Sequence, residues 1–279
     1  MGRLATDPRP LIMGTLNVTP DSFSDGGRFF LSGTVDVDEV VAAATQMVEE
    51  GADILDIGGE STRPGAASIT TEQELERVVP VIEALARHLD VPLSVDSSDP
   101  VVMTEAVGVG ATLINDVRAL ARPGALVAAA AAVRDHDVSV CLMHMRGEPG
   151  TMSDRAQYTD LVAEVMDELL ARIHQALQMG IPASRLIVDP GFGFAKTTTQ
   201  NLQILKHLSD FKSLGFPLLV GLSRKRMIGE ITGRAVSERV AGSVALALLA
   251  VERGARIVRV HDVAATRDVL RLFSAMNDA

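Results

Sequence analysis

Eight short apolar runs, each ending in a polar residue or a glycine, most strongly constrain the fold of this 279-residue chain. Stretches with helical spacing separate the runs, and such alternation is typical of parallel βαβ units. Eight strands with intervening helices predict a closed (β/α)8 TIM barrel, a fold that reaches this length as one domain. The runs are LIMGTLN (11–17), ADILDIG (52–58), PLSVDS (92–97), ATLIND (111–116), VSVCLMH (138–144), RLIVD (185–189), PLLVGLS (217–223) and RIVRVH (256–261).

Three of the intervening stretches, 40–48, 75–89 and 162–177, place apolar residues three and four apart, which predicts one-faced helices. Glycines typical of helix ends occur at Gly51, Gly180 and Gly254. An open, doubly wound sheet is the alternative fold. Its dinucleotide-binding form needs GxGxxG after the first strand, and NVTPDSFSDGG lacks that spacing. We expect a flexible N-terminus over residues 1–10 and one barrel domain over residues 11–279.

Charge and cysteine content narrow the class of protein. A formal net charge of −10 does not favour binding to nucleic acid or to an anionic membrane. The single cysteine, Cys141, lies in an apolar run and is expected to be a buried, inert thiol, as in proteins of a reducing cytoplasm. Neither an N-terminal signal core nor a run of the ~18–20 apolar residues that span a membrane is present. The sequence therefore predicts a cytoplasmic protein.

The polar ends of the apolar runs predict where a ligand binds. Active sites of (β/α)8 barrels lie at the carboxyl ends of the strands, where residues i and i+2 share a face. One such Asp is often a helix N-cap, which is the favoured interpretation for Asp116 and Asp262. Polar residues at nearly every strand end instead indicate a polar ligand, because buried acids and amides without partners are costly. The residues expected at one mouth are Asn17, Asp56, Asp96, Asn115, His144, Asp189, Ser223, Arg259 and His261.

Cations at three of these loops indicate a ligand that carries phosphate. They come from Arg63, from the SRKR stretch at 223–226, and from Arg259 beside His261. In the SRKR stretch, Lys225 lies between two arginines that would lower its pKa. A Schiff-base role and a role as hydrogen-bond donor both remain open for this lysine.

The GFGFAKT stretch at 191–197 is not a phosphate loop, because Ala195 stands where that motif needs a glycine before the lysine. Its two aromatic residues, Phe192 and Phe194, could pack against a planar substrate or against the following helix. A histidine-bound zinc is not expected, since the sequence has neither an HxH pair nor HExxH. Asn17 together with a substrate phosphate could hold Mg²⁺, which takes few protein ligands.

Eight segments in sequence order closely resemble those of bacterial dihydropteroate synthases, from about Leu11 to Asp268. They are LNVTPDSFSDGG, DIGGESTRPG, LSVDSS, LINDV, LMHMRGEP, DPGFGFAK, GLSRKRMIG and RVHDV. The resemblance implies a (β/α)8 transferase of folate biosynthesis. It would join p-aminobenzoate to 6-hydroxymethyl-7,8-dihydropterin pyrophosphate, giving 7,8-dihydropteroate and pyrophosphate. It also implies a Mg²⁺ cofactor, a cytoplasmic homodimer and a target of sulfonamides.

The same resemblance implies roles for individual residues. Asn17 would meet Mg²⁺ and the pyrophosphate, which Arg63, Arg259 and His261 would also bind. The pterin would be held by Asp96, Asn115, Asp189 and Lys225, with Met143 and Arg259 against its faces, and Asp56 is grouped with the substrate-binding residues. Thr62, Pro64, Phe194 and Ser223 would shape the p-aminobenzoate pocket that sulfonamides imitate. Two departures from the family pattern, Ser97 for Thr and Arg226 for Ser, leave loop packing and drug sensitivity open.

The reaction expected from these residues is a dissociative substitution. Loss of pyrophosphate would leave positive charge on the pterin, which carboxylates can stabilise, and the aromatic amine needs no strong base. Three alternatives remain: a pterin-dependent methyltransferase on a similar barrel, a lyase using Lys225 as a Schiff base, and a pterin carrier without turnover.

Overall fold

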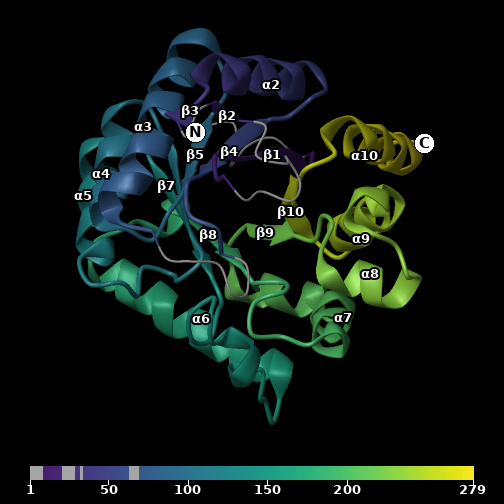
Figure 1. Cartoon of the computed structure of the whole chain (residues 1–279). Coiled ribbons are helices and arrows are strands. Elements are labelled where there is room, and N and C mark those ends of the chain that lie inside the picture. Colours follow the sequence, from purple (N-terminus) through teal and green to yellow (C-terminus); the bar gives the residue numbers. More distant parts are fainter. Residues whose placement is uncertain (1–8, 21–28, 32–33, 63–68) are drawn as a thin grey trace.

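The computed structural model describes residues 9–20, 29–31, 34–62 and 69–279 and contains a closed barrel of eight parallel strands (Figure 1). Around the barrel, the strands follow the order β1-β10-β9-β8-β7-β6-β5-β4. All eight predicted strands and the predicted (β/α)8 fold are confirmed, which excludes the open sheet. The strands are β1 (Leu11–Asn17), β4 (Ile54–Gly58), β5 (Leu93–Asp96), β6 (Leu113–Asp116), β7 (Ser139–Met143), β8 (Leu186–Asp189), β9 (Leu218–Gly221) and β10 (Ala255–Val260).

Helices surround the barrel in chain order (Figure 1). The three predicted helical stretches lie within α2, α3 and α6, and the glycines that follow α2, α6 and α9 have positive φ, as expected of helix ends. A short antiparallel pair, β2 (Phe30–Leu31) and β3 (Thr34–Val35), was not predicted. The helices are α2 (Val37–Glu49), α3 (Thr71–His88), α4 (Pro100–Gly108), α5 (Ala125–Asp135), α6 (Leu161–Gln178), α7 (Thr198–Lys206), α8 (Arg226–Thr232), α9 (Val240–Glu252) and α10 (Val263–Asn277), with 3₁₀ turns at Met152–Arg155, Ala183–Arg185, Leu208–Leu214 and Val236–Glu238.

The strands are buried on both faces, which explains why their sequences are almost continuously apolar. Alternate residues point to the barrel interior, where they form a separate cluster of Leu11, Met13, Ile54, Leu113, Cys141, Ile187, Leu219 and Ile257. Their neighbours along the strands, such as Ile12, Leu55 and Val140, pack against the helices instead. The predicted buried, free thiol of Cys141 is confirmed, and burial raises its pKa, which makes it unreactive.

The start of the barrel is fixed by an ion pair. Arg9 donates to both carboxylate oxygens of Asp53 at 2.6 and 3.0 Å, and Asp53 also accepts from the backbone N–H of Ile12 at 2.9 Å. Residues 1–8 lie outside the described part of the chain, so the flexible N-terminus stays a prediction. Among the described residues, no helix is both long enough and apolar enough to cross a bilayer.

The N-cap of α6 provides a prediction for stability. The exposed Asp160 accepts from the backbone N–H of Ala163 at 3.2 Å. Replacing a capping Asp with Ala costs about 1 kcal/mol, so Asp160→Ala should lower the free energy of unfolding by that amount. Asp160→Asn, which keeps a capping oxygen, should restore most of the loss. Urea denaturation measures both, and equal destabilisation by the two variants would exclude the cap as the cause.

Candidate active site

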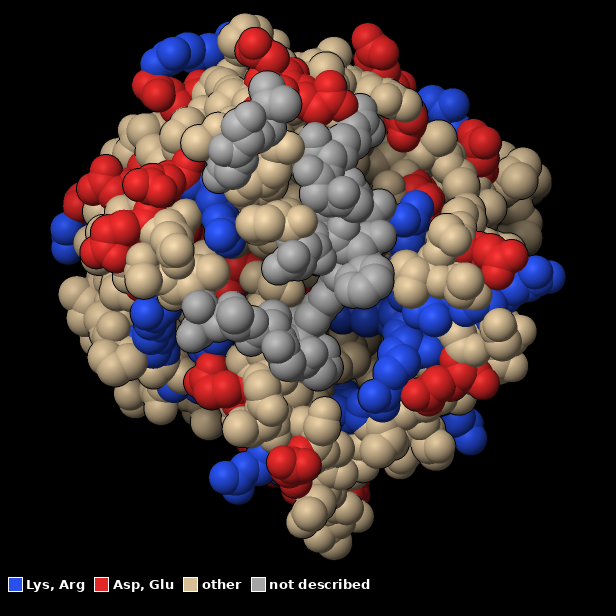
Figure 2. All heavy atoms as spheres, in the orientation of Figure 1, with Lys and Arg blue, Asp and Glu red and all other residues tan. Residues whose placement is uncertain are grey.

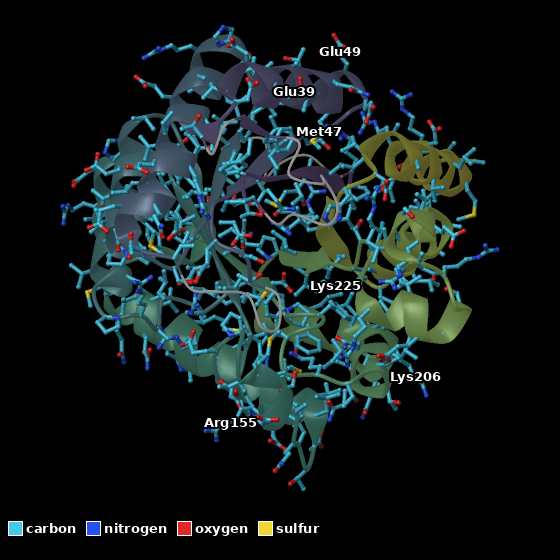
Figure 3. The ribbon with its side chains drawn as sticks, in the orientation of Figure 1. Glu39, Met47, Glu49, Arg155, Lys206 and Lys225 are labelled. Atoms are coloured by element: carbon cyan, nitrogen blue, oxygen red, sulfur yellow. The ribbon has the colours of Figure 1, made fainter. Side chains whose placement is uncertain are left out.

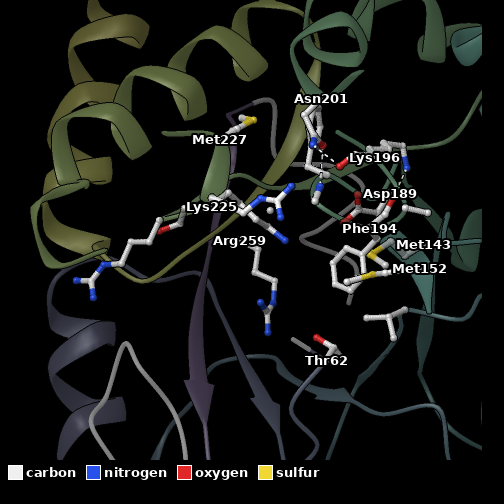
Figure 4. A pocket seen from close by; sticks show the side chains of 18 of the residues that line it. Thr62, Met143, Met152, Asp189, Phe194, Lys196, Asn201, Lys225, Met227 and Arg259 are labelled. Atoms are coloured by element: carbon white, nitrogen blue, oxygen red, sulfur yellow. Dashed lines mark hydrogen bonds between the residues drawn. The ribbon is translucent and has the colours of Figure 1, made fainter. Parts of the chain in front are cut away.

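A cavity of about 540 Å³ opens at the carboxyl ends of the barrel strands. Figure 4 shows side chains from several strand ends and loops pointing into it. The predicted site residues in the described part of the chain line the cavity, apart from Asp56 and His144; Arg63 and Pro64 lie outside the described residues. Those that line it are Asn17, Thr62, Asp96, Asn115, Met143, Asp189, Phe194, Ser223, Lys225, Arg259 and His261.

Arg259, on β10, is bound by two carboxylates across the floor of the cavity. Its Nε donates to Asp56 Oδ2 at 2.5 Å and its Nη2 donates to Asp96 Oδ2 at 2.9 Å. Burial raises the pKa of Asp96 to about 7, and Asp56 adds to the effect while Arg259 opposes it. Burial acts to lower the pKa of Arg259, but the two carboxylates hold it above its ordinary value. The guanidinium is therefore a permanent, fixed cation facing the cavity.

Asp56 differs from its prediction as a substrate-binding residue. Its side chain is 0% exposed and lies beneath the cavity, because its place on β4 is a layer deeper than the strand-end residues. Its carboxylate accepts from Arg259 and, at 3.3 and 3.4 Å, from Nδ2 of Asn115. These bonds fix the Asn115 amide with its nitrogen toward Asp56, which leaves the carbonyl oxygen to accept from a ligand.

Asp189, Lys225 and Phe194 form a second group in the cavity (Figure 4). Asp189 Oδ1 accepts from the backbone N–H of Gly191 at 2.7 Å, and Lys225 Nζ lies 4.6 Å from the centroid of the Phe194 ring. Burial raises the pKa of Asp189 to about 6 and lowers the pKa of Lys225 to about 8. An acid and an ammonium therefore face the cavity together, partly compensating each other's burial.

The lowered pKa of Lys225 was predicted, but its cause differs from the predicted one. Burial is the main cause, and Arg259 adds to it, rather than the sequence neighbours Arg224 and Arg226. Arg224 makes a bidentate bond to Asp262 at 2.6 and 3.1 Å, and Arg226 pairs with Glu230 at 2.9 Å. Asp262 occupies the N-cap position of α10, as predicted, but its side chain makes the ion pair with Arg224 and no capping hydrogen bond.

Asp116, interpreted from the sequence as a helix N-cap, instead stabilises a local turn, because the next helix, α5, has Gly124 at its N-cap. One of its carboxylate oxygens accepts from the backbone N–H of Arg118 at 2.8 Å and the other from that of Leu120 at 2.7 Å. It also accepts from the Ser98 hydroxyl, to which Arg118 donates at 2.9 Å. Asp116 is therefore a structural residue of the turn after β6 and does not line the cavity.

His261 is neutral and is held by Ser223. Burial lowers its pKa to about 3, and the neighbouring cations Arg259 and Arg224 lower it further. Its backbone N–H donates to Ser223 Oγ at 3.2 Å, and the same hydroxyl lies 3.0 Å from its Nδ1. A serine hydroxyl has two acceptor lone pairs and one proton, so the contact fits either tautomer of the ring; when the hydroxyl donates to Nδ1, the imidazole proton is on Nε2. In that tautomer, His261 can donate to an anion without itself being charged.

His144 does not point into the cavity, contrary to its prediction. Met143, one residue earlier, lines the cavity, so alternation along β7 turns His144 outward to the helices. Its Nε2 lies 3.0 Å from Glu168 on α6 and its Nδ1 lies 2.9 Å from Lys196 Nζ. Burial, with Lys196, lowers the pKa of His144 to about 4, so the ring is neutral, accepts from Lys196 and donates to Glu168.

Several cavity residues were not identified from the sequence. Lys196 and Asn201 line the cavity beside Phe194, and Met152 adds an apolar wall (Figure 4). Lys196 belongs to the GFGFAKT stretch, where the sequence interpretation concerned the absent phosphate loop and the two phenylalanines but gave the lysine no role. Only the structure distinguishes this segment, because Ala195 has a φ of +46°, which is rare for a residue with a side chain.

Positively charged side chains concentrate at this mouth although the chain has a formal net charge of −10. Figure 2 shows Lys and Arg side chains gathered near the centre of the face, next to β9 and α8. In Figure 3, Lys225 lies inside the ring of helices, whereas Lys206, Arg155 and Glu49 lie on its outside. Basic residues that line the cavity are Lys196, Arg224, Lys225, Arg226, Arg239 and Arg259. Such a site suits an anionic ligand.

The cavity can accommodate a metal ion only with help from a ligand. Among the described residues, no group of three or more His, Cys, Asp or Glu side chains is placed to hold one. Asn17, at the end of β1, supplies an amide beside the basic residues of the mouth. One amide oxygen plus phosphate and water oxygens fits the ligand preference of Mg²⁺.

Comparisons with known proteins agree with the site. A family model described as "Pterin binding enzyme" matches residues 13–261. Dihydropteroate synthase of Haemophilus influenzae is 48% identical over 97% of this chain and 95% of its own length. The Yersinia pestis enzyme, solved with a sulfonamide drug, is 47% identical, with a TM-score of 0.92 over 97% of this chain and 95% of that one.

A third relative was solved with ligands of the reaction. The Xanthomonas albilineans dihydropteroate synthase with 4-aminobenzoic acid is 53% identical, with a TM-score of 0.89 over 98% of this chain and 94% of that one. The same enzyme with 7,8-dihydropteroate is 49% identical, with a TM-score of 0.86 over 98% of this chain and 95% of that one. From this identity over nearly its full length, the chain belongs to the dihydropteroate synthase family of pterin-binding enzymes.

Proposed function

We propose that this chain condenses 6-hydroxymethyl-7,8-dihydropterin pyrophosphate with p-aminobenzoate, giving 7,8-dihydropteroate and pyrophosphate. One observation carries the proposal. A single cavity joins hydrogen-bonding groups suited to a heterocycle, Asp189, Asn115 and Lys225, to the Arg259 and His261 donors suited to a leaving diphosphate. The ligands named for the X. albilineans relative, 4-aminobenzoic acid and 7,8-dihydropteroate, are substrate and product of this reaction.

The pterin edge matches the polar groups of the cavity. A pterin presents an amino group and ring N–H donors next to a carbonyl acceptor. Asp189 keeps one carboxylate oxygen beyond its bond to Gly191 to accept from those N–H donors, and Lys225 can donate to the carbonyl. The carbonyl oxygen of Asn115 and the carboxylate of Asp96 accept from the remaining ring N–H groups. Met143 and Arg259 lie against the two faces of the ring.

p-Aminobenzoate is proposed to pack beside Phe194. The Phe194 ring forms part of the cavity wall together with Thr62 and Ser223, and an aromatic acid can stack there. Pro64, outside the described residues, is proposed to complete this pocket. Sulfonamides, which imitate p-aminobenzoate, would compete for the same space.

The pyrophosphate is proposed to bind Arg259 and His261 Nε2–H, with Arg63 from outside the described residues. Asn17 would hold Mg²⁺ together with the substrate's phosphate oxygens. When bound, this ion supplies neutralisation of the charge that develops on the leaving pyrophosphate. Arg259 adds a fixed positive charge that needs no reorganisation during reaction, because two carboxylates already orient it.

The substitution is proposed to be dissociative. The carbon–oxygen bond to pyrophosphate breaks first, and the pterin methylene cation is stabilised by the Asp96 and Asp189 carboxylates near the ring. The lone pair of the p-aminobenzoate nitrogen then forms the new C–N bond, and that nitrogen loses a proton. An aromatic amine is nucleophilic while neutral, so the cavity needs no strong general base.

Pyrophosphate release tests the function. With pterin pyrophosphate, Mg²⁺ and p-aminobenzoate, turnover should yield equal amounts of pyrophosphate and 7,8-dihydropteroate. Chelation of Mg²⁺ should slow it about 10²-fold or more, because several kcal/mol of charge stabilisation are lost. Slow release without p-aminobenzoate should also be detectable, and its complete absence would contradict the dissociative order. Pterin pyrophosphate binding without turnover would identify a carrier, and a borohydride-trapped adduct at Lys225 would favour a lyase.

A cytoplasmic homodimer is part of the same proposal and rests on the family resemblance. It has support from the surface, because Leu249 on α9 and Leu272 and Met276 on the adjoining α10 are exposed apolar side chains. Such side chains on neighbouring helices suit a face between two copies. Light scattering at micromolar concentration distinguishes a dimer from a monomer.

A further inference from the structure

We propose that Lys196 is a positioning residue for p-aminobenzoate, because its ammonium group fixes the loop between β8 and α7 that carries Phe194. This inference rests on the proposed function of the cavity. The loop, residues 190–197, leaves the strand at Asp189 and enters α7 at its capping residue Thr197.

The three protons of the Lys196 ammonium match three acceptors. Nζ donates to Nδ1 of His144 at 2.9 Å, to the carbonyl oxygen of Gly191 at 3.1 Å and to that of Phe194 at 3.1 Å. The side chain is only 6% exposed. Since an ammonium has three N–H groups and each has a protein acceptor, none is left for a substrate. Lys196 therefore acts on the loop and not on a ligand directly.

The two carbonyls that Lys196 binds flank the part of the loop that shapes the cavity. One belongs to Gly191, whose N–H donates to Asp189, and the other belongs to Phe194, whose ring lies beside Lys225. Asp189 is also held by its place at the end of β8, paired with Met143 of β7. Phe194 has no strand to support it, so the Phe194 side of the cavity depends more strongly on Lys196 than the Asp189 side.

The loop needs such support because its backbone is unusual. Gly191 has a φ of +71°, and a Cβ there would lie 1.9 Å from the carbonyl oxygen of His144. Ala195 has a φ of +46° in spite of its side chain. Conformations of this kind persist only where surrounding contacts determine them. Tyr158 supplies another such contact by donating to the carbonyl oxygen of Ala195 at 3.0 Å.

Asn201, on the first turns of α7, holds the same loop independently. Its Oδ1 accepts from the N–H of Gly193 at 2.7 Å, and its Nδ2 donates to the carbonyl oxygens of Lys196 and Thr197 at 3.2 and 2.8 Å. Gly193 itself packs on Lys225, since a Cβ at this position would lie 3.1 Å from Lys225 Cδ. The two side chains thus bind alternating backbone groups of the segment that places Phe194 beside Lys225, Lys196 at residues 191 and 194 and Asn201 at residues 193, 196 and 197.

The test is a kinetic comparison of Lys196→Met and Lys196→Gln with Lys206→Met as the control. Lys206 is an exposed lysine on the outside of α7 (Figure 3). Burial lowers the pKa of Lys196 to about 7, so assays at pH 6.5 keep most of the lysine charged. Lys196→Met should raise KM for p-aminobenzoate about tenfold and KM for pterin pyrophosphate about twofold. The larger effect is expected for p-aminobenzoate because displacement of Phe194 misplaces this substrate more than the pterin.

Lys196→Gln, which retains two N–H donors, should give an intermediate KM for p-aminobenzoate, and Lys206→Met should leave both constants unchanged. A merely structural role would lower the amount of active enzyme and reduce kcat without changing the ratio of the two KM values; that result would overturn the proposal. If Lys196→Met does not fold, Asn201→Ala must show the same selective rise in KM for p-aminobenzoate, or the proposal is wrong. Wild-type enzyme without turnover would instead refute the proposed function itself.

Discussion

Replacement of Arg259 by methionine should lower kcat/KM about 10³-fold, the order expected when a preoriented group that stabilises the transition state is lost. Arg259 lines the cavity and is bound at 2.5 Å to Asp56 and at 2.9 Å to Asp96. Methionine fills similar space but cannot bind pyrophosphate. It also leaves two buried acids without their cation, so the fold should lose about 3–5 kcal/mol of stability.

A second substitution separates the two effects. In Asp56→Asn/Arg259→Met, one of the buried charges is gone, so much of the lost stability should return while kcat/KM stays low. Urea denaturation and steady-state kinetics measure the two quantities on the same preparations. Arg134→Met is the matched control, since that arginine is exposed and pairs only with Asp135 among the described residues. Recovery of activity along with stability in the double variant would show that Arg259 is structural.

The fold was predictable because its strands are buried on both faces. Runs such as LIVD at 186–189 have apolar residues in every position except the last, and the last is where the barrel opens. The carboxyl-end groups Asp96, Asn115, Asp189 and Arg259 could therefore be placed in one cavity from the strand pattern alone. The pair β2–β3 was missed because strands of two residues have no readable period.

The same burial on both faces explains the error at His144. When all residues of a run are apolar, the sequence does not show which alternate set faces the barrel interior. In β7 it is Cys141 and Met143, so His144 turns toward α6. Asp56 shows the complementary limit. The alternation of residues along β4 correctly predicts that Asp56 points into the barrel, but it does not show how far below the cavity Asp56 lies. Its partner Arg259 is 203 residues away in the chain.

Lys196 and Asn201 could not be found from the sequence because their role depends on contacts distant along the chain and on backbone shape. His144, the imidazole that accepts from Lys196, is 52 residues earlier in the sequence. The Gly191 and Phe194 carbonyls become acceptors only once the loop has its positive φ values. Local spacing predicts strands and their ends, whereas such loop contacts require the closed barrel.

Asp189→Asn should reduce kcat/KM for pterin pyrophosphate about 10³–10⁴-fold, while KM for p-aminobenzoate stays near the wild-type value. The carboxylate is proposed to accept from N–H donors of the pterin, and an asparagine amide would present its own N–H₂ to them. Sites built to hydrogen-bond a substrate discriminate by such factors, because an unmatched buried polar group is costly. Asp167→Asn, an exposed acid on α6, is the control and should change neither constant.

The pH dependence gives the same substitution an independent readout. Burial raises the Asp189 pKa from 3.8 to about 6, so the folded state favours the protonated acid; this contribution to stability is complete below pH 3.8 and is lost as pH rises through 6. Above pH 7, the unliganded Asn variant should therefore be more stable than wild type, by up to about 3 kcal/mol. Activity has the opposite sign, because wild-type kcat/KM for pterin pyrophosphate should fall as pH drops below about 6, where the carboxylate gains a proton. A variant that is less stable at pH 8, or a wild-type profile that is flat down to pH 5, would show that Asp189 does not act as the buried pterin acceptor.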